Sequence, residues 1–453
     1  MVRPIKISST QKEYSKFGGL ILACDFLHRS QAGALAGECL PLLKGGVARS
    51  QKKFEDMVLG LVGGAECLDD MAEMERDVGF REICGSVYSA KSYGDFLRSF
   101  TDLQCKQMNA RLADYGYQLR QFLREQSASI TFDIDSTVNQ QYGKKMQGVR
   151  INHEGVLCLD SLAVFDEFGL QYANVVRAGA TPTSVGAAEL VHQIFSRMPK
   201  SENFADMRRF VRGDSGLCRH AFFLSCFAAN AGFVVAMRSN MYGPLVHRIR
   251  NWTPQSIKDE SRIIFRDGRD CEIGETIYQP RDFPKMLRVV IARAPKKQAQ
   301  RSLFRDEDYD YFAVVSNIGD HEMSAEKLVK FYRQRGNAEN FIKEEKYGFD
   351  LHHYPCLKLT ANKAYGVIAG FAYNILRFLA LSENPIKTRR AKGMRNLLIF
   401  LPIQLVRHAR SVTFRFMSHH YAEVNRWQKN IRLLQFRYAK ESWGPPGNWA
   451  GAL

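Results

Sequence analysis

Three carboxylates in this sequence have the neighbours expected of metal ligands. Asp135 ends an alternating run of β-forming residues (SITFDID), in which Asp133 points to the same face two residues earlier. Asp214 follows Gly213, which we expect to let the backbone turn, and Glu339 lies in a helical segment. Carboxylates that converge from different elements can hold two Mg²⁺ ions about 3.5–4 Å apart. We therefore expect metal-dependent chemistry on a phosphodiester.

The segment around Glu339 presents a phenol, a guanidinium and an ammonium beside this acid. On one continuous helix of about 100° per residue, Tyr332 and Lys346 each lie about 20° from Glu339. Arg335 lies about 40° from the same acid. Such a stripe suits a metal-bound phosphodiester, because the cations can hold phosphate oxygens while the acid holds metal. The alternative is a solvated helix carrying an i,i+4 ion pair between Arg335 and Glu339.

The charge of the chain favours a polyanionic partner. Lys and Arg total 64 and Asp and Glu total 47 among 453 residues, which gives a formal net charge of +17. Residues 387–440 hold thirteen basic residues against one acid, Glu423, so this tail alone contributes +12. Aromatic residues are interleaved with these cations, a combination that suits contact with a nucleic-acid backbone and its bases. A solubilising surface is the alternative for the tail.

The order of the expected elements indicates an α/β core. Residues 1–127 are mostly helical in pattern, and the apolar residues of 92–124 fall near a 3.6-residue period. Beyond them the pattern predicts three strands, a helix, a strand, a helix and a strand, over residues 129–135, 156–165, 171–177, 185–197, 208–214, 217–231 and 233–238. Three strands followed by alternating helix and strand is the order of a ribonuclease-H-like α/β domain, a mixed sheet flanked by helices.

This core is expected to be interrupted before its third acid. Helical periodicity fades over residues 240–317, where 287–294 and 311–316 are strand-like, and strong helices return from Ser324 and over 361–381. The predicted division is a helical N-terminal DNA-binding region, the first part of the core, a β-rich insertion, the second part of the core with the Glu339 helix, and a basic C-terminal region: 1–127, 128–239, 240–317, 318–385 and 386–453.

Composition argues against membrane and disulfide-stabilised classes. The apolar stretches 221–237 and 364–381 are short for a membrane span of about 20 residues and contain polar residues. The N-terminus lacks the apolar core of a secretion signal. The ten cysteines include no CxxC pair, so we expect buried, reduced thiols rather than a zinc or redox site. A soluble, cytoplasmic protein is expected.

Three motifs resemble the group 1 DDE transposases of bacterial insertion sequences. They are FDIDST at 132–137, RGDSGLCR at 212–219, and a Y-x2-R-x3-E-x6-K signature formed by Tyr332, Arg335, Glu339 and Lys346. The resemblance implies a cut-and-paste enzyme that cleaves double-stranded DNA at terminal inverted repeats and joins the 3′-OH to target DNA, as a homodimer on the DNA. It also implies two Mg²⁺ ions, for which Mn²⁺ can substitute.

Carried over to this chain, the resemblance implies that Asp135, Asp214 and Glu339 are catalytic metal ligands. The same resemblance implies that Tyr332, Arg335 and Lys346 hold phosphates. Asp133 is the second choice for the first acid, since FDIDST offers two aspartates and Asp135 precedes the Ser-Thr pair. Two alternatives stay open: a metal-dependent endonuclease or resolvase on this fold, and a catalytically idle DNA-binding protein derived from a transposase.

Trp252 is a further candidate for DNA contact. It lies in the basic stretch HRIRNW at 247–252, within the expected insertion. Related cut-and-paste transposases stack an aromatic residue of this insertion on a flipped base. Such stacking contributes about 1–3 kcal/mol per base to binding. The alternative is that Trp252 anchors the small hydrophobic core of the insertion.

Overall fold

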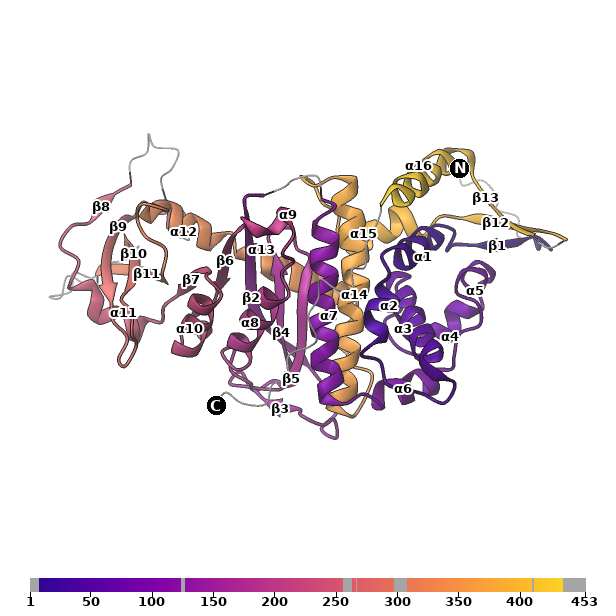
Figure 1. Cartoon of the computed structure of the whole chain (residues 1–453), viewed down its shortest axis with the longest axis horizontal. Coiled ribbons are helices and arrows are strands. Elements are labelled where there is room, and N and C mark those ends of the chain that lie inside the picture. The colour runs from indigo at the N-terminus through magenta and orange to yellow at the C-terminus, as the bar shows by residue number, and fades with distance from the viewer. Residues whose placement is uncertain are drawn as a thin grey trace, which may run out of the picture. The chain divides into compact units, whose positions relative to one another are not determined.

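A computed structural model describes residues 8–123, 127–255, 263–265, 267–296, 308–409 and 411–434 of the chain. These residues form two compact units (Figure 1). Unit 1 contains the described residues of 8–122, 145–147 and 344–434, and unit 2 contains those of 123, 127–144 and 148–343. Helix α13, Gly336–Gly348, begins in unit 2 and ends in unit 1.

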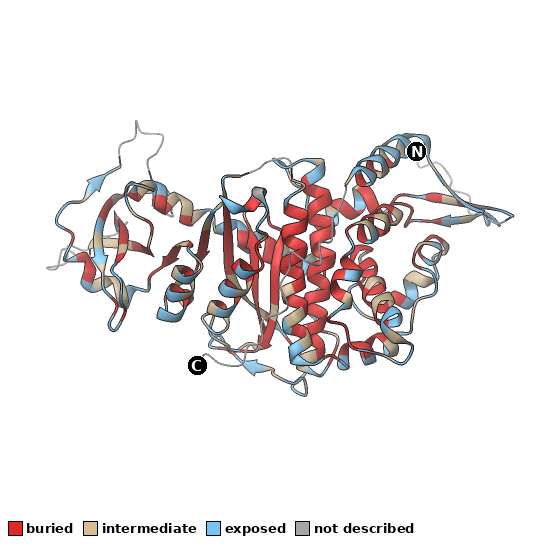
Figure 2. Ribbon diagram, viewed as in Figure 1, coloured by how far each residue is buried: buried red, intermediate tan, exposed pale blue. Residues whose placement is uncertain are grey.

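Unit 1 is built around one long apolar helix. Helix α14, Leu359–Glu383, contacts α3, α6 and α7, and its residues from Ala361 to Leu381 are almost all buried (Figure 2). A helix that is apolar all round belongs in a core. Although α14 is long and apolar enough to cross a membrane, its most apolar window is entirely buried inside the protein. The N-terminal helices are α1 Leu20–Arg29, α2 Ala32–Gly37, α3 Gly46–Val62, α4 Asp70–Glu75, α5 Val78–Cys84, α6 Ala90–Arg98 and α7 Asp102–Arg120.

The C-terminal part of unit 1 contributes a small sheet and further helices. Strand β12, Ile403–His408, pairs antiparallel with β1, Glu13–Ser15, and with β13, Ser411–Phe416. Short helix α15, Ala391–Met394, leads into a π-helical turn, and α16, Ser418–Leu433, contacts α1. This sheet therefore joins the two ends of the described chain within one unit.

Unit 2 is organised by one mixed sheet. Its described strands run in the order β3-β4-β2-β6-β7-β11-β10-β9-β8, and β5 also pairs with β4. Strands β2, β6 and β7 are mutually parallel, and the other pairs are antiparallel. The strands are β2 Ser129–Gln140, β3 Arg150–Ile151, β4 Leu157–Asp166, β5 Gln171–Ala178, β6 Arg208–Gly213, β7 Gly232–Ala236, β8 Thr253–Pro254, β9 Glu272–Tyr278, β10 Leu287–Pro295 and β11 Tyr309–Ser316.

The helices of unit 2 include α8 and α10, which contact each other beside the sheet. Strands β9 to β11 lie in the segment expected to interrupt the core, and β11 pairs with β7, so they extend the same sheet. The helices are α8 Ala187–Ser196, α9 Glu202–Ala205, α10 His220–Ala228, α11 Ser239–Val246 and α12 Ala325–Arg333, with a 3₁₀ turn at Ser215–Leu217. A mixed α/β architecture with a multi-stranded sheet and flanking helices is confirmed.

The expectation of one continuous helix through Tyr332 and Glu339 is wrong. Helix α12 ends at Arg333 and α13 begins at Gly336. In a continuous helix the Phe331 carbonyl would accept the N–H of Arg335. Here that N–H donates to the Tyr332 carbonyl at 3.0 Å, and the side chain of Arg212 donates to the Phe331 carbonyl at 2.7 Å.

Candidate metal-binding site

Parallel pairing of β2 with β6 brings the first two candidate acids to neighbouring positions. The pairing ends with Ile134 opposite Gly213, so Asp135 and Asp214 are the next residues on the two strands. Strand β2 itself continues to Gln140 through pairing with β4, so Asp135 does not end the strand as expected. It lies instead where β2 and β6 separate. Polar side chains can therefore gather at this edge without breaking β2.

Asp135 is largely buried and its two carboxylate oxygens are both held. Oδ2 accepts a hydrogen bond from Arg335 Nη1 at 2.8 Å, and Oδ1 accepts one from the backbone N–H of Ser136 at 2.9 Å. Burial raises the pKa of Asp135 to about 6, against the opposing effect of Arg335 and with a further rise from the charge of Asp214.

Asp214 caps the short 3₁₀ turn that follows β6. Its Oδ1 accepts the backbone N–H of Gly216 at 2.9 Å. A Cβ on Gly216 would lie 3.0 Å from Asp214 Oδ1 and 2.9 Å from Thr183 Cβ, so glycine permits this close approach. Gly213 is not among the glycines with positive φ, and a Cβ there would lie 2.3 Å from Leu217 Cδ1, so a larger residue would force the Leu217 side chain to move. The glycine is therefore explained by its close contact with Leu217 and not by the backbone turn that we expected there.

Arg335 connects the first acid to the third. Its Nη1 donates to Asp135, and its Nη2 lies 3.5 Å from Glu339 Oε1. The side chain of Glu339 is 54% exposed, on the first turn of α13. Although burial lowers the pKa of Arg335, the charge of Asp135 raises it above the ordinary value. A positive group therefore already lies between two carboxylates at this edge of the sheet.

Asp133 has a different environment from Asp135. It is fully buried and accepts two hydrogen bonds from Arg212, from Nε at 2.7 Å and from Nη2 at 2.8 Å. The two residues are directly opposite in the β2–β6 register. A bidentate, dry ion pair occupies both oxygens of Asp133. Asp135 also has both oxygens hydrogen-bonded, but its side chain is 13% exposed whereas that of Asp133 is 0% exposed, so burial favours Asp135 as the acid that a metal can reach.

Arg212 is the residue of the site that the sequence reasoning did not single out. Its Nη1 donates to the Phe331 carbonyl at 2.7 Å and to Gln334 Oε1 at 3.2 Å. Its guanidinium also lies 4.8 Å from the centre of the Phe331 ring. Arg212 thus ties β2 and β6 to the junction of α12 and α13. Its place in a predicted strand, two residues before a candidate acid, is the signal that could have identified it.

The other two signature residues lie in different surroundings. The Tyr332 ring is buried in the core, 5.4 Å from the Phe312 ring, and it interacts with Arg335. Lys346 lies in the part of α13 that belongs to unit 1, and partial burial lowers its pKa. The break before α13 means that Tyr332 and Glu339 do not share one helical face.

Trp252 is half-buried and contacts residues of its own unit. The Arg293 guanidinium lies 4.0 Å from the centre of the indole, and the Tyr311 ring lies 6.4 Å away. A Cβ on Gly274 would lie 3.1 Å from Trp252 Cε3. These contacts support the anchoring alternative over a ring free to stack on a base.

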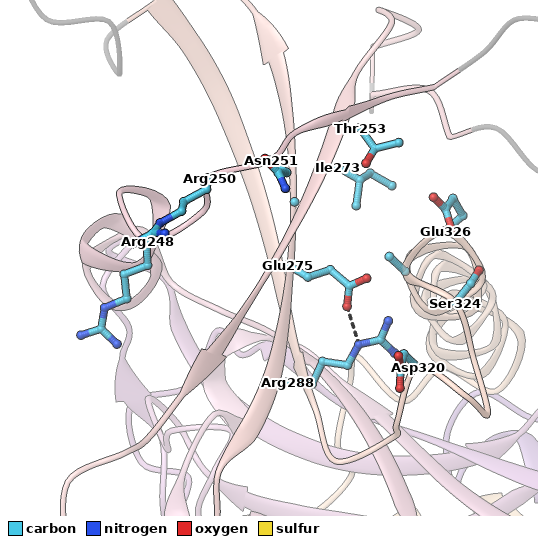
Figure 3. Close-up of a pocket in the computed structure, with 12 residues that line it drawn as sticks. Arg248, Arg250, Asn251, Thr253, Ile273, Glu275, Arg288, Asp320, Ser324 and Glu326 are labelled. Atoms are coloured by element: carbon cyan, nitrogen blue, oxygen red, sulfur yellow. Dashed lines mark hydrogen bonds and ion pairs between the residues drawn. The ribbon is translucent and has the colours of Figure 1, made fainter.

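A cavity of about 540 Å³ lies away from the three acids, beside β9 and the start of α12 (Figure 3). Its lining includes three arginines and three acidic residues, and Glu275 pairs with Arg288 at 2.6 Å. Figure 3 shows Arg248 directed away from that pair. Because its lining charges balance, this cavity offers no net attraction for a phosphate.

Comparison with models of protein families identifies the family of this chain. The family model described as transposase DDE domain group 1 matches residues 3–436 of the chain. A search of curated proteins found no match. The matched range includes every candidate residue of the site.

Proposed function

Because this chain belongs to the group 1 family of DDE transposase domains, we propose that it cuts double-stranded DNA at transposon ends and joins the freed 3′-OH to target DNA. The observation that carries the proposal is the meeting of Asp135 and Asp214 on adjacent parallel strands, with Arg335 between Asp135 and Glu339. The strand order β5-β4-β2-β6-β7, with only the last three parallel, supports assignment to a ribonuclease-H-like core.

The donor set suits Mg²⁺ or Mn²⁺. Carboxylate oxygens are the ligands that these ions prefer, and a cationic group is already accommodated between Asp135 and Glu339. In this proposal Asp135, Asp214 and Glu339 would hold the two ions. Two bound ions would supply Lewis-acid activation of the attacking oxygen and stabilisation of the departing 3′ oxygen.

The protein's own side chains position the acids and the DNA backbone. Arg335 neutralises Asp135 before the reaction and, once released from it, can donate two hydrogen bonds to a phosphate. Tyr332 supports Arg335 from the core, and Lys346 supplies a second cation for phosphate. Trp252 anchors the strands around β9 in this account, and stacking on a flipped base remains the competing role.

The proposal is tested by removing each acid isosterically. Asp135→Asn, Asp214→Asn and Glu339→Gln should each abolish Mg²⁺-dependent cleavage of the element's terminal inverted repeats while leaving DNA binding largely intact. Binding survives because phosphate contacts elsewhere dominate affinity. Asp320→Asn, at an acid whose side chain is 85% exposed, is the matched control and should keep full activity.

Other results of these assays would indicate a different function for the wild-type protein. Cleavage without strand transfer would indicate an endonuclease or resolvase, and DNA binding without cleavage by the wild type would indicate an idle transposase-derived protein. Full activity of Asp135→Asn would overturn its role as the first acid. We further propose that the active complex is a homodimer that brings two transposon ends together.

A further inference from the structure

Two histidines and an aspartate converge just after helix α13, in unit 1. Asp350 Oδ1 lies 3.1 Å from His352 Nδ1 and 3.0 Å from His353 Nδ1. The ligand-bearing atoms of the three side chains all lie within 4.8 Å of one another. One carboxylate oxygen therefore faces two imidazole nitrogens at the same time.

A backbone carbonyl also contacts one histidine of this cluster. The carbonyl oxygen of Lys346, in the last turn of α13, lies 3.0 Å from His352 Nδ1. Asp350 has a φ of 52°, a left-handed conformation that costs energy for a residue other than glycine. Its side chain is mostly buried, as is that of His352, while His353 is half exposed. The strained backbone of Asp350 thus places its partly buried carboxylate beside both imidazoles.

We propose that Asp350, His352 and His353 form a binding site for a transition-metal ion of the Zn²⁺ class, separate from the carboxylate site. Tetrahedral zinc with bonds of about 2.0–2.1 Å has ligand atoms about 3.3 Å apart, close to the 3.0 and 3.1 Å separations in the cluster. Imidazole nitrogens favour Zn²⁺ over Mg²⁺, whereas the three catalytic candidates offer only oxygens. The two sites therefore select different metals.

The position of the cluster gives the ion a structural role. Bound there, it ties the last turn of α13 to the loop that leads into α14. Each imidazole would bind it through Nδ1 as the neutral tautomer that carries its proton on Nε2, in place of its present contact with Asp350. The site would thus stabilise the end of the helix that carries Lys346.

The test measures metal uptake by the full chain. Purified protein is dialysed against Zn²⁺ in excess Mg²⁺, bound zinc is counted, and the melting temperature is recorded with and without Zn²⁺. The wild type should bind one more equivalent of zinc than His352→Asn/His353→Asn. Zinc should raise its melting temperature and leave that of the variant unchanged.

The chain offers a matched control in His419 and His420. These adjacent histidines of α16 also have ring centres 4.0 Å apart, as His352 and His353 do. His419→Asn/His420→Asn should keep the extra equivalent of zinc. Equal zinc uptake by the wild type and His352→Asn/His353→Asn, with both proteins folded by circular dichroism, would overturn the proposal and leave a hydrogen-bonded turn. Because the readout is zinc bound, its failure is distinguishable from loss of DNA cleavage.

Discussion

Asp135 is ionised at a cost to the folded state. Burial raises its pKa to about 6, Arg335 opposes that rise and Asp214 adds to it. In the unfolded chain an aspartate has a pKa of about 3.9. As the pH rises, the unfolded state therefore releases this proton first, and the folded state loses stability between about pH 4 and pH 6. Above that window the whole cost is present.

Asp135→Asn should therefore stabilise the protein in the absence of metal. We expect a gain of about 1–3 kcal/mol in the free energy of unfolding at about pH 8 and none at about pH 4, since one pKa unit corresponds to about 1.4 kcal/mol. Urea unfolding at both pH values measures it. The exposed Asp320→Asn should change stability by less than about 0.5 kcal/mol. A less stable Asp135→Asn at the higher pH would contradict this account.

At the scale of elements, the pair of Asp133 and Arg212 holds the acid-bearing segments together. Asp133 lies in β2 and Arg212 in β6, each two residues before a candidate acid, and Arg212 also binds the end of α12. Taking both charges out of water is costly, so the pair contributes little net stability compared with apolar side chains. Its contribution is to fix where α12 ends and therefore where Arg335, which follows α12 in the chain, is placed.

Arg212→Gln should both destabilise the protein and impair cleavage. Leaving Asp133 as an unpaired buried charge should lower the free energy of unfolding by about 3–5 kcal/mol. Asp133→Asn/Arg212→Gln should recover part of that loss, because no lone charge remains. Urea unfolding and DNA cleavage at a temperature where each variant is folded are the measurements.

Arg177 supplies the control for this prediction. It forms a buried ion pair with Asp160, between β5 and β4 of the same sheet. Arg177→Gln should lose stability comparably but retain cleavage in the folded state. If both variants lost cleavage equally while folded, the positioning role of Arg212 would be refuted.

Sequence patterns predicted the strands better than the helix ends. The runs expected at 171–177 and 208–214 are observed as Gln171–Ala178 and Arg208–Gly213. The helical spacing of apolar residues, however, continues across positions where one helix ends and the next begins. The pattern over 92–124 contains the end of α6 and a new start at Thr101, which caps α7, just as the pattern through Glu339 contains the gap between α12 and α13. Those breaks are set by capping and by Arg212, not by the apolar spacing.

At the scale of the whole molecule, sequence order cannot show which segments pair. Strand β11 joins β7, so the strands expected to interrupt the core extend its sheet. Helix α14, near the C-terminus, forms the core of the N-terminal helices of unit 1. The three candidate acids were found from motifs, whereas the Asp133–Arg212 pair depends on register between β2 and β6. Local patterns carry no information about that register.

Some basic residues of the C-terminal tail are buried or ion-paired within the protein and are not free on its surface. Arg395 is buried, donates to the carbonyls of Leu61 and Val62, and has a pKa lowered by burial to about 10. Arg407 pairs with two glutamates of the N-terminal region. Three of the thirteen basic residues counted from the sequence, Arg410, Arg437 and Lys440, lie outside the described residues. Any contact of this tail with DNA is therefore expected from those of its cations that remain exposed.

Exposed cations of β13 and α16 should provide part of the DNA affinity. Arg415, Lys429 and Arg432 are exposed, and replacing all three with Gln should weaken DNA binding. It should also make the slope of log affinity against log salt concentration shallower by about 0.9 for each phosphate that these residues no longer neutralise. Fluorescence anisotropy over a series of salt concentrations measures both effects.

A charge-matched variant separates this prediction from a general loss of positive charge. Lys144, Lys200 and Lys285 are exposed lysines of unit 2. Replacing these three with Gln removes the same charge, so any long-range effect of net charge on binding should be equal in the two triple variants. Only direct phosphate contacts release condensed counterions, so only the tail variant should show the smaller salt slope. Equal slopes in the two variants would mean that these tail residues are a solubilising surface.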